Sequence, residues 1–454
     1  MAQPVAARPS ATAGPPRDLP ALLRRILTLA TPTTVLAIFQ VIAQLAETWL
    51  AARQGTAALA GWAVVLPFAL LLQQMSAGAM GGGVVSAIAR ALGAGRNDEA
   101  SALVRHVLLI ALSGGLLFTL TLAVFPMAIF TFIAGPDIAA AAAPYALWLF
   151  GAGAIPAWLA NTLGSVLRGG QRHRLAARIL ILTWVVFPVL GWALAEPGGL
   201  GLMGLGIAYA VSFAAAALIM SIVVLRGGAG FTPSLRGPIS ASLLNRVLSV
   251  GLVACGLAAI SNLTTILVTS QIKHYGTTAV AAYGISARLE FFVVPLAFGI
   301  GSALTALVGG AVGARDWLNA RRIAWLGGAL AFAVTATIGL LVAVFSRPFA
   351  LFFTQDPGVV DVASLALMFI GPAFGAYGLG MAMYFAAMGA GRMRWPVYGA
   401  FARIIVATLG GWVLATVFDM GISGHFLGVA LGIVCYGLFT ARGVRAAYWR
   451  ASDS

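Results

Sequence analysis

The second half of this chain repeats its first half at a nearly constant offset. Gly169 and Arg172 return as Gly389 and Arg392, 220 positions later. The stretch 55–60 returns as 276–281, and the Gly-Trp pair at 191–192 returns at 411–412. Two homologous halves predict a site at their interface and a motion of one half against the other, an arrangement typical of secondary transporters.

The repeated halves are too apolar for a water-soluble domain. Hydrophobic residues make up 61% of the 454 residues and charged residues only 9%, too few to cover a surface of this size. Apolar runs of about 20 residues match the thickness of a bilayer, in which the backbone must pair internally and therefore forms helices. The sequence predicts twelve membrane helices, at 26–52, 59–89, 103–130, 144–167, 176–196, 201–225, 247–274, 278–311, 323–346, 361–388, 395–418 and 423–443.

These helices divide the chain into two pseudo-symmetric lobes of six helices each, so the expected fold class is an all-α integral membrane protein. We place the lobes at 20–226 and 245–446, joined by a linker at 227–244. The remaining segments are tails: 1–19, which is rich in Ala, Pro and Arg, and 447–454. No secretory signal is evident, because the first apolar run is long enough to stay in the membrane.

The net charge of +15 does not indicate nucleic-acid binding, because the basic residues are divided among loops. Arginines gather in alternate loops and at both ends of the chain, near 90–105, 168–178, 226–246, 315–322, 392–403 and 442–450. This is the positive-inside pattern, and it predicts a multi-pass membrane protein with both termini in the cytoplasm. We expect it to act as a monomer in contact with the lipid bilayer and with no nucleic acid.

A charged residue inside the bilayer indicates a functional site, because burying a charge there costs free energy. Glu47 is one of two acids inside predicted helices, and its spacing places it on one helix face with Gln40 and Gln44. Such a face predicts a cavity, in which a desolvated carboxyl group can bind and release a proton near neutral pH. The alternative is a permanently protonated glutamic acid that only bonds a neighbouring helix.

The second intramembrane acid is Glu290, near the middle of the eighth predicted helix. Arg288 is close in sequence but points to another side of the helix. Two interpretations remain open for Glu290: a functional group facing the cavity, or a structural acid paired through a neighbour or with the backbone.

No catalytic residues, metal ligands or bound cofactor are predicted. The four histidines lie far apart, and Cys255 and Cys435 lie inside predicted helices as small apolar residues. A cavity for a small amphipathic molecule would be lined by aromatic and methionine side chains, although any one of them could instead pack in a core or face lipid. The candidates are Phe39, Phe68, Met75, Trp158, Tyr377 and Tyr384.

Residues 20–445 resemble the multidrug and toxic compound extrusion (MATE) transporters, because several short motifs occur in the same order as in that family. The first helix carries Leu-Ala-Thr-Pro at 29–32 and an acid fifteen residues after the proline, where the family usually has aspartate. The turn at 89–96 is similar to the family's "SRxLGAG", and residues 281–290 are similar to "AAYGIAxRIE". Asn161 with Leu-Arg-Gly-Gly-Gln at 167–171, and Gly-Ala-Gly-Arg at 389–392 with Pro396, match two further helix ends.

The resemblance implies a bacterial inner-membrane antiporter with two six-helix lobes around a central V-shaped cavity. It implies export of amphipathic, often cationic, compounds, driven by entry of H⁺ or Na⁺. The family's first-lobe cation site centres on the first-helix acid, with helpers on helices four and five. By motif, Glu47 and Asn161 occupy two of those positions.

The sequence departs from the family where further carboxylates would complete a sodium site. The fifth helix has Thr183 and Phe187 before Pro188 in place of Asn and Asp, and the tenth helix has Tyr377 and Tyr384 but no acid. A lone carboxyl group can carry a proton but coordinates Na⁺ poorly, so we favour H⁺ as the coupling ion over Na⁺.

Another alternative, a flippase for lipid-linked precursors, needs a basic cavity, whereas Arg288 is the one arginine predicted inside the membrane. A third alternative is a membrane-embedded enzyme. The sequence disfavours it, because no segment contains a histidine paired with an acid.

Overall fold

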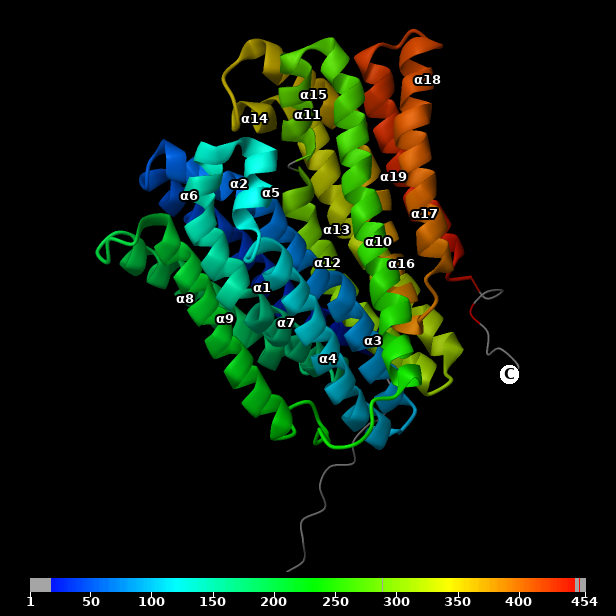
Figure 1. The fold of residues 1–454 in the computed structure, drawn as a ribbon. Helices are drawn as coiled ribbons and strands as arrows, with labels where there is room; N and C mark the ends of the chain where they lie inside the picture. Colours follow the sequence, from blue (N-terminus) through cyan, green and yellow to red (C-terminus); the bar gives the residue numbers. More distant parts are fainter. Residues whose placement is uncertain (1–17, 288, 446–448, 450–454) are drawn as a thin grey trace, which may run out of the picture.

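The computed structural model describes residues 18–287, 289–445 and 449, with the backbone alone for 290–292. Most of the described chain is helical and none of it forms a strand. Figure 1 shows the helices running roughly side by side through the molecule. The all-α prediction is therefore confirmed. The predicted tails 1–19 and 447–454 lie almost wholly outside the described residues.

The first half contains six long helical segments, two of which pass through π-helical turns. Pro126 and Pro136 stand at helix starts, because proline cannot donate to the helical hydrogen-bond ladder, and Pro188 lies inside α8. The elements are α1 (Leu19–Arg53), α2 (Thr56–Gln73), a π turn (Gln74–Ala79), α3 (Met80–Gly93), α4 (Asn97–Leu122), α5 (Pro126–Ala134), α6 (Pro136–Ala146), a π turn (Leu147–Ala152), α7 (Ala154–Gly169), α8 (His173–Ala195) and α9 (Gly201–Leu225).

The second half repeats this order with shorter interruptions. Its elements are α10 (Ala241–Ile272), a 3₁₀ turn (Lys273–Tyr275), α11 (Thr277–Ala287), α12 (Leu289–Gly313), α13 (Trp317–Val344), α14 (Ser346–Leu351), α15 (Pro357–Ile370), a 3₁₀ turn (Gly371–Ala373), α16 (Phe374–Ala390), α17 (Arg394–Ile405), a π turn (Val406–Gly410), α18 (Gly411–Thr416) and α19 (Ile422–Arg442).

Eleven helices of the described chain are long and apolar enough to span a membrane, or twelve when α6 and α7 are taken as one span bent by 45°. The predicted twelve spans are thus confirmed, with differences at several of their ends, of which two change the course of the chain. The third helix ends at Leu122, not at 130, because Pro126 starts the separate helix α5. The fourth span begins at Pro136, eight residues before the predicted start, and bends at Gly153.

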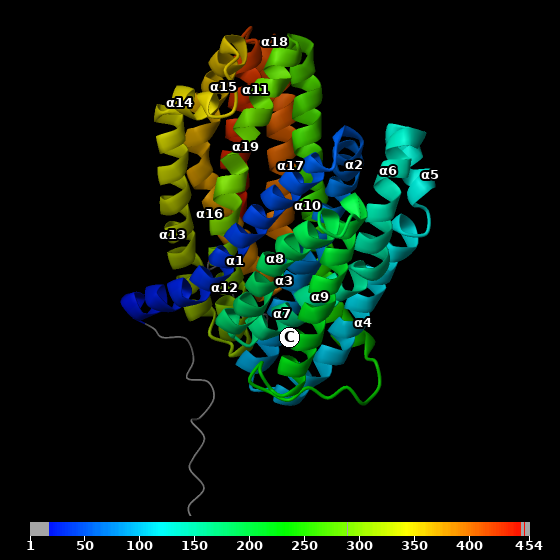
Figure 2. The same cartoon turned by 90° about the vertical axis from the view of Figure 1, so that its left-hand side faces the viewer.

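Helix α1 belongs to the hydrophobic cores of both halves. Leu22 and Ile26, near its beginning, pack with Leu304 and Leu307 of α12 in the second half. Beyond Pro32, the helix instead contributes Leu36, Ala43, Leu50 and Ala51 to the core of the first half. The helix therefore crosses from one half to the other along its length, as Figure 2 shows.

The segment between α9 and α10 runs across one end of the molecule, which we call the linker end (Figure 1). Helix α4 holds this segment in place. The Arg105 guanidinium donates to the backbone oxygens of Arg236 (2.9 Å) and Pro238 (3.0 Å), and His106 Nε2 accepts from the Ser240 amide at 2.8 Å. The connection between the halves is thus fixed to the first half.

The two halves meet tightly at the linker end through small residues. Ser86 of α3 donates to the backbone oxygen of Met388 at 2.6 Å, at the end of α16. A Cβ atom at Gly93 of α3 would overlap the backbone oxygen of Gly310 of α12, and one at Gly313 would overlap that of Arg90. Glycine is required at these positions because the two backbones touch.

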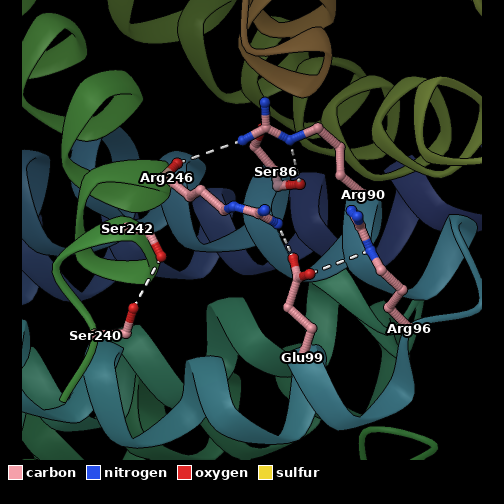
Figure 3. Close-up of polar contacts among 7 residues, drawn as sticks. All are labelled: Ser86, Arg90, Arg96, Glu99, Ser240, Ser242 and Arg246. Atoms are coloured by element: carbon pink, nitrogen blue, oxygen red, sulfur yellow. Dashed lines mark hydrogen bonds and ion pairs between the residues drawn. The ribbon is translucent and has the colours of Figure 1, made fainter.

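Charged side chains line the rim of this contact. Figure 3 shows Glu99 of α4 between Arg96 and Arg246, the latter from α10 in the second half. Arg90 donates to the backbone oxygens of Ser86 (3.3 Å) and Arg246 (3.4 Å). At the opposite end, Figure 2 shows α2, α5 and α6 standing apart from α14, α15 and α18. The halves are therefore joined at the linker end and diverge away from it.

Replacing Gly93 with leucine should force α3 away from α12 and lower the free energy of unfolding by about 1–3 kcal/mol, the usual cost of overpacking. Thermal unfolding of the purified protein in detergent measures this change. Gly256→Leu in α10 is the matched control, because a Cβ atom there meets no other atom within 4 Å. Equal destabilisation by both substitutions would contradict the close contact at Gly93.

Candidate functional site

Glu47 is buried inside the first half and is bonded there by a tyrosine. Its exposed fraction is 6%, and the Tyr145 hydroxyl of α6 donates to its carboxylate Oε1. The Trp62 indole of α2 lies beside both groups, and its Nε1 reaches no acceptor within hydrogen-bond distance in the described residues. No ion pair to Glu47 is found in the described part of the chain. The carboxyl group thus has neutral neighbours, which can stabilise it without a permanent counter-ion.

A second set of polar side chains lies deeper in the same half. Asn161 of α7 is 1% exposed, and its amide nitrogen donates to Gln73 Oε1 (3.0 Å) and Ser76 Oγ (2.9 Å). Gln73 Nε2 in turn donates to the Tyr209 hydroxyl of α9 at 2.8 Å. The bonds continue from Asn161 toward the linker end, since its backbone oxygen accepts from Ser165 Oγ at 2.9 Å.

The two sets belong to one site. Tyr145, which bonds Glu47, lies on α6, and Tyr209, which bonds Gln73, lies on α9, and these two helices pack against each other. The Tyr209 ring is held edge-on against Phe187 of α8 at 5.7 Å between ring centroids. We call the group formed by Glu47, Trp62, Gln73, Tyr145, Asn161 and Tyr209 the first-half polar cluster.

The structure brings together only part of the residue set that we predicted for cation coupling. Glu47 and Asn161 both belong to the cluster, although no direct bond joins them. Gln40 and Gln44 are half-buried, and their side chains make no hydrogen bond within the described residues. Thr183 is buried on α8, where its hydroxyl donates to the backbone oxygen of Ile179 at 3.0 Å.

Sequence reasoning missed Gln73, Tyr145 and Tyr209. Gln73 carried a signal, because it is an amide within an apolar membrane helix. The tyrosines carried none beyond their residue type. Tyr145 is 98 positions from Glu47 in the sequence, and only the packing of α6 against α2 and α9 brings its hydroxyl to the acid.

The aromatic candidates of the first half lie mostly within its interior. Phe68 packs edge-on against Phe130 at 5.9 Å, and Met75 is partly buried against the first core. Trp158 is 2% exposed and packs on Phe118 of α4 at 6.5 Å. Phe39 is half-buried on α1.

In the second half, Tyr384 packs in a hydrophobic cluster that contains residues of both halves, including Ala79 and Val250. Tyr377 is buried, with the Arg403 guanidinium 5.6 Å from its ring centre. Arg288 and the side chain of Glu290 lie outside the described residues, so their predicted roles stay predictions.

Arg403 corrects the expectation that Arg288 is the one intramembrane arginine, and Arg168 is a second buried arginine, at a helix end. Arg403, which we grouped with the loop residues, is 9% exposed within the membrane span Arg394–Thr416. Arg168, grouped likewise, is 3% exposed at the end of α7, and its Nη2 donates to Ser165 Oγ at 2.7 Å. In the described parts of the chain, no three His, Cys, Asp or Glu side chains come together as metal ligands.

Comparison with known proteins gives matches along nearly the whole chain. The family model described as MatE matches residues 32–193 and 254–413, one block in each half. The probable multidrug resistance protein NorM of Acinetobacter baylyi is 34% identical to this chain over 206 residues. The alignment covers 43% of this chain and 44% of that protein, so it spans less than half the length of this relative. The probable multidrug resistance protein YoeA of Bacillus subtilis is 23% identical over 424 residues, 91% of each chain. A crystal structure of the Vibrio cholerae MATE transporter VcmN in the bent form shares the fold, with a TM-score of 0.87 at 21% identity, covering 95% of this chain and 99% of that one.

Replacing Tyr145 with phenylalanine removes the hydroxyl that donates to Glu47 and leaves a buried carboxyl group without that partner. We expect the free energy of unfolding to fall by about 1–3 kcal/mol, the usual cost of an unsatisfied buried polar group. Thermal unfolding in detergent measures the loss. Tyr398→Phe is the control, because that side chain is exposed and should shift stability by less than about 0.5 kcal/mol. Equal stability of the two variants would show that the Tyr145 bond contributes nothing.

Proposed function

This chain belongs to the MatE family of membrane transporters, and we propose that it exports amphipathic compounds in exchange for protons carried by Glu47. The observation that carries this proposal is a buried carboxyl group with a tyrosine donor and no cationic partner among the described residues. An intramembrane acid is costly to bury, and in transporters such groups commonly serve proton transfer. The relatives named for multidrug resistance support export of drug-like compounds.

The atoms around Glu47 favour a proton over a sodium ion. Hard cations are held by several oxygen ligands. Glu47 supplies two carboxylate oxygens, but the neighbouring groups are the Tyr145 hydroxyl, which donates its hydrogen to the acid, and the Trp62 indole, which can only donate. The oxygens of Gln73 and Ser76 each already accept a hydrogen bond from Asn161. A proton needs only one of the carboxylate oxygens.

Protonation of Glu47 would change the bonds that position α1. The ionised carboxylate can only accept hydrogen bonds, whereas the protonated acid can also donate one. Beyond Pro32, α1 packs in the hydrophobic core of the first half, and before Pro32 it packs in the core of the second half. A shift of α1 at Glu47 would therefore change the contact between the halves. Proton binding can thus favour one arrangement of the halves, and drug binding the other.

The exported compound would bind between the halves, where they diverge. We expect amphipathic and often cationic molecules, for which Tyr384 and Met75 are aromatic and thioether contacts near the junction. The arginine-rich linker end supports an orientation with both termini in the cytoplasm of a bacterial inner membrane.

The flippase alternative is disfavoured by the positions of the two buried arginines. A pyrophosphate headgroup needs basic side chains facing a shared cavity. Arg168 bonds Ser165 within its own helix in the first half. Arg403 lies over the Tyr377 ring in the core of the second half.

Replacing Glu47 with glutamine keeps the size of the side chain but removes its ability to exchange a proton. In proteoliposomes with an imposed pH gradient, we expect drug export by Glu47→Gln to fall to the level of protein-free vesicles. Glu196→Gln is the matched control, because Glu196 lies at a helix end in an exposed ion pair with Arg53. It should transport as the unmodified protein does. Export by Glu47→Gln that keeps its full response to pH would overturn the proposal.

The coupling ion is tested by imposing each gradient separately. The unmodified protein should export a fluorescent cationic drug under a pH gradient at equal sodium, and should not respond to a sodium gradient at equal pH. Transport driven by sodium alone would replace the proton with Na⁺ in this mechanism.

A further inference from the structure

A groove of about 500 Å³ lies at the linker end, between the beginning of α1 and the beginning of α8. Its apolar wall is formed by Pro20, Leu23, Leu27 and Pro32 of α1. Leu27 is exposed even though the opposite face of the helix, with Leu22 and Ile26, is fully buried. The groove thus offers an apolar strip on the outside of a membrane protein, where a hydrocarbon chain can lie.

Two arginines line this groove, one from each of its two helices. Arg24 of α1 and Arg174 of α8 both line the groove, and both are exposed. Neither forms an ion pair or side-chain hydrogen bond within the described residues, and no acid lines the groove. The hydroxyls of Thr28 and Thr31 donate to backbone oxygens of α1 at 2.7 Å. The arginines are therefore the groove's uncommitted charged donors.

The groove lies where the membrane helices reach the linker end. Arg174 is the second residue of α8, and the loop just before this helix packs against the linker, because a Cβ atom at Gly170 would overlap the backbone oxygen of Ala229. Beyond Arg25, α1 is free of charge until Glu47. Arginines followed by lipid-length apolar segments mark the level of phospholipid headgroups.

We propose that this groove binds one anionic phospholipid, with its phosphate between Arg24 and Arg174 and an acyl chain along Leu23 and Leu27. Guanidinium groups bind phosphate oxygens through paired, charge-assisted hydrogen bonds. Basic pockets between membrane helices are suited to anionic headgroups, and the apolar strip supplies the contact that a free phosphate would lack.

The bound lipid would connect the two halves of the transporter. The part of α1 that carries Arg24 packs in the second core through Leu22 and Ile26, whereas α8 packs in the first core. In this arrangement Arg25 donates to Gln171 at 2.6 Å, which holds the two walls together. A ligand that contacts elements of two moving bodies binds their arrangements unequally and so shifts the equilibrium between them. This inference does not depend on which ion drives transport.

Native mass spectrometry of the purified full-length protein, titrated with phosphatidylglycerol, tests the site. Removing one arginine should weaken binding about fivefold, and Arg24→Gln with Arg174→Gln should weaken it roughly thirtyfold, because each surface arginine contributes a similar increment toward an anionic lipid. Arg226→Gln is the matched control with equal loss of charge, since Arg226 is an exposed arginine at the end of α9 outside the groove. It should bind as the unmodified protein does.

A second variant keeps both charges and fills the groove. Thr31→Trp should reduce phosphatidylglycerol binding by a similar factor, which preserves the test if the double arginine variant fails to fold. Phosphatidylcholine and glycerol phosphate are the comparison ligands, and both should bind at least about tenfold more weakly, because one lacks net charge and the other lacks acyl chains. Equal binding of phosphatidylglycerol and phosphatidylcholine, equal loss in Arg226→Gln, or full binding of glycerol phosphate would each overturn the proposal.

Discussion

The burial of Glu47 imposes the strongest chemical constraint on this molecule. A carboxylate away from water is costly unless hydrogen bonds or an opposite charge compensate for the lost hydration. The structure supplies a hydrogen bond from Tyr145 and places Trp62 beside the pair, but it supplies no ion pair within the described residues. A fixed cation would hold the acid permanently ionised. Neutral donors leave both protonation states accessible, and this is the property that a proton carrier needs.

Helix α1 carries this constraint to the rest of the fold. Its Glu47 end belongs to the first core, and its beginning, before Pro32, belongs to the second. Proline at the crossover removes a helical hydrogen bond and so makes the two parts easier to bend against each other. The same helix therefore lines the first-half polar cluster, the contact between the halves and the groove at the linker end. A change at one of these places can reach the others through a single continuous element.

The lengths of the apolar segments and the internal repeat were enough to predict the fold. Bilayer thickness and the need to pair backbone groups allow few alternatives to a bundle of membrane-spanning helices. Local interruptions were harder to predict. A long apolar run through residue 130 hid the break at Phe125, where Pro126 begins a new helix. The π turn at Gln74–Ala79 also has no signature in composition, although it lies beside Gln73 of the site.

The candidate site was predictable only where a residue was unusual for its setting. Glu47 stood out because an acid is rare inside a membrane, and Asn161 stood out through the family motif. Tyr145 and Tyr209 did not, since tyrosine is common in membrane helices and its role depends on which helices become neighbours. Arg168 and Arg403 misled for the same reason: arginines near predicted loops are usually exposed, whereas here the flanking helices bury them.

The contact at the linker end depends on packing rather than on charge. The ion pairs around Glu99 involve Arg96 and Arg246, whose side chains are 52% and 44% exposed, and such pairs contribute only about 0–1 kcal/mol. The approach of Gly93 to Gly310 and of Gly313 to Arg90 brings backbone against backbone. Any arrangement that opens this end must separate these glycine contacts and release Ser86 from the Met388 backbone oxygen. The rim charges can remain hydrated throughout, so the small residues between them decide how firmly the end is closed.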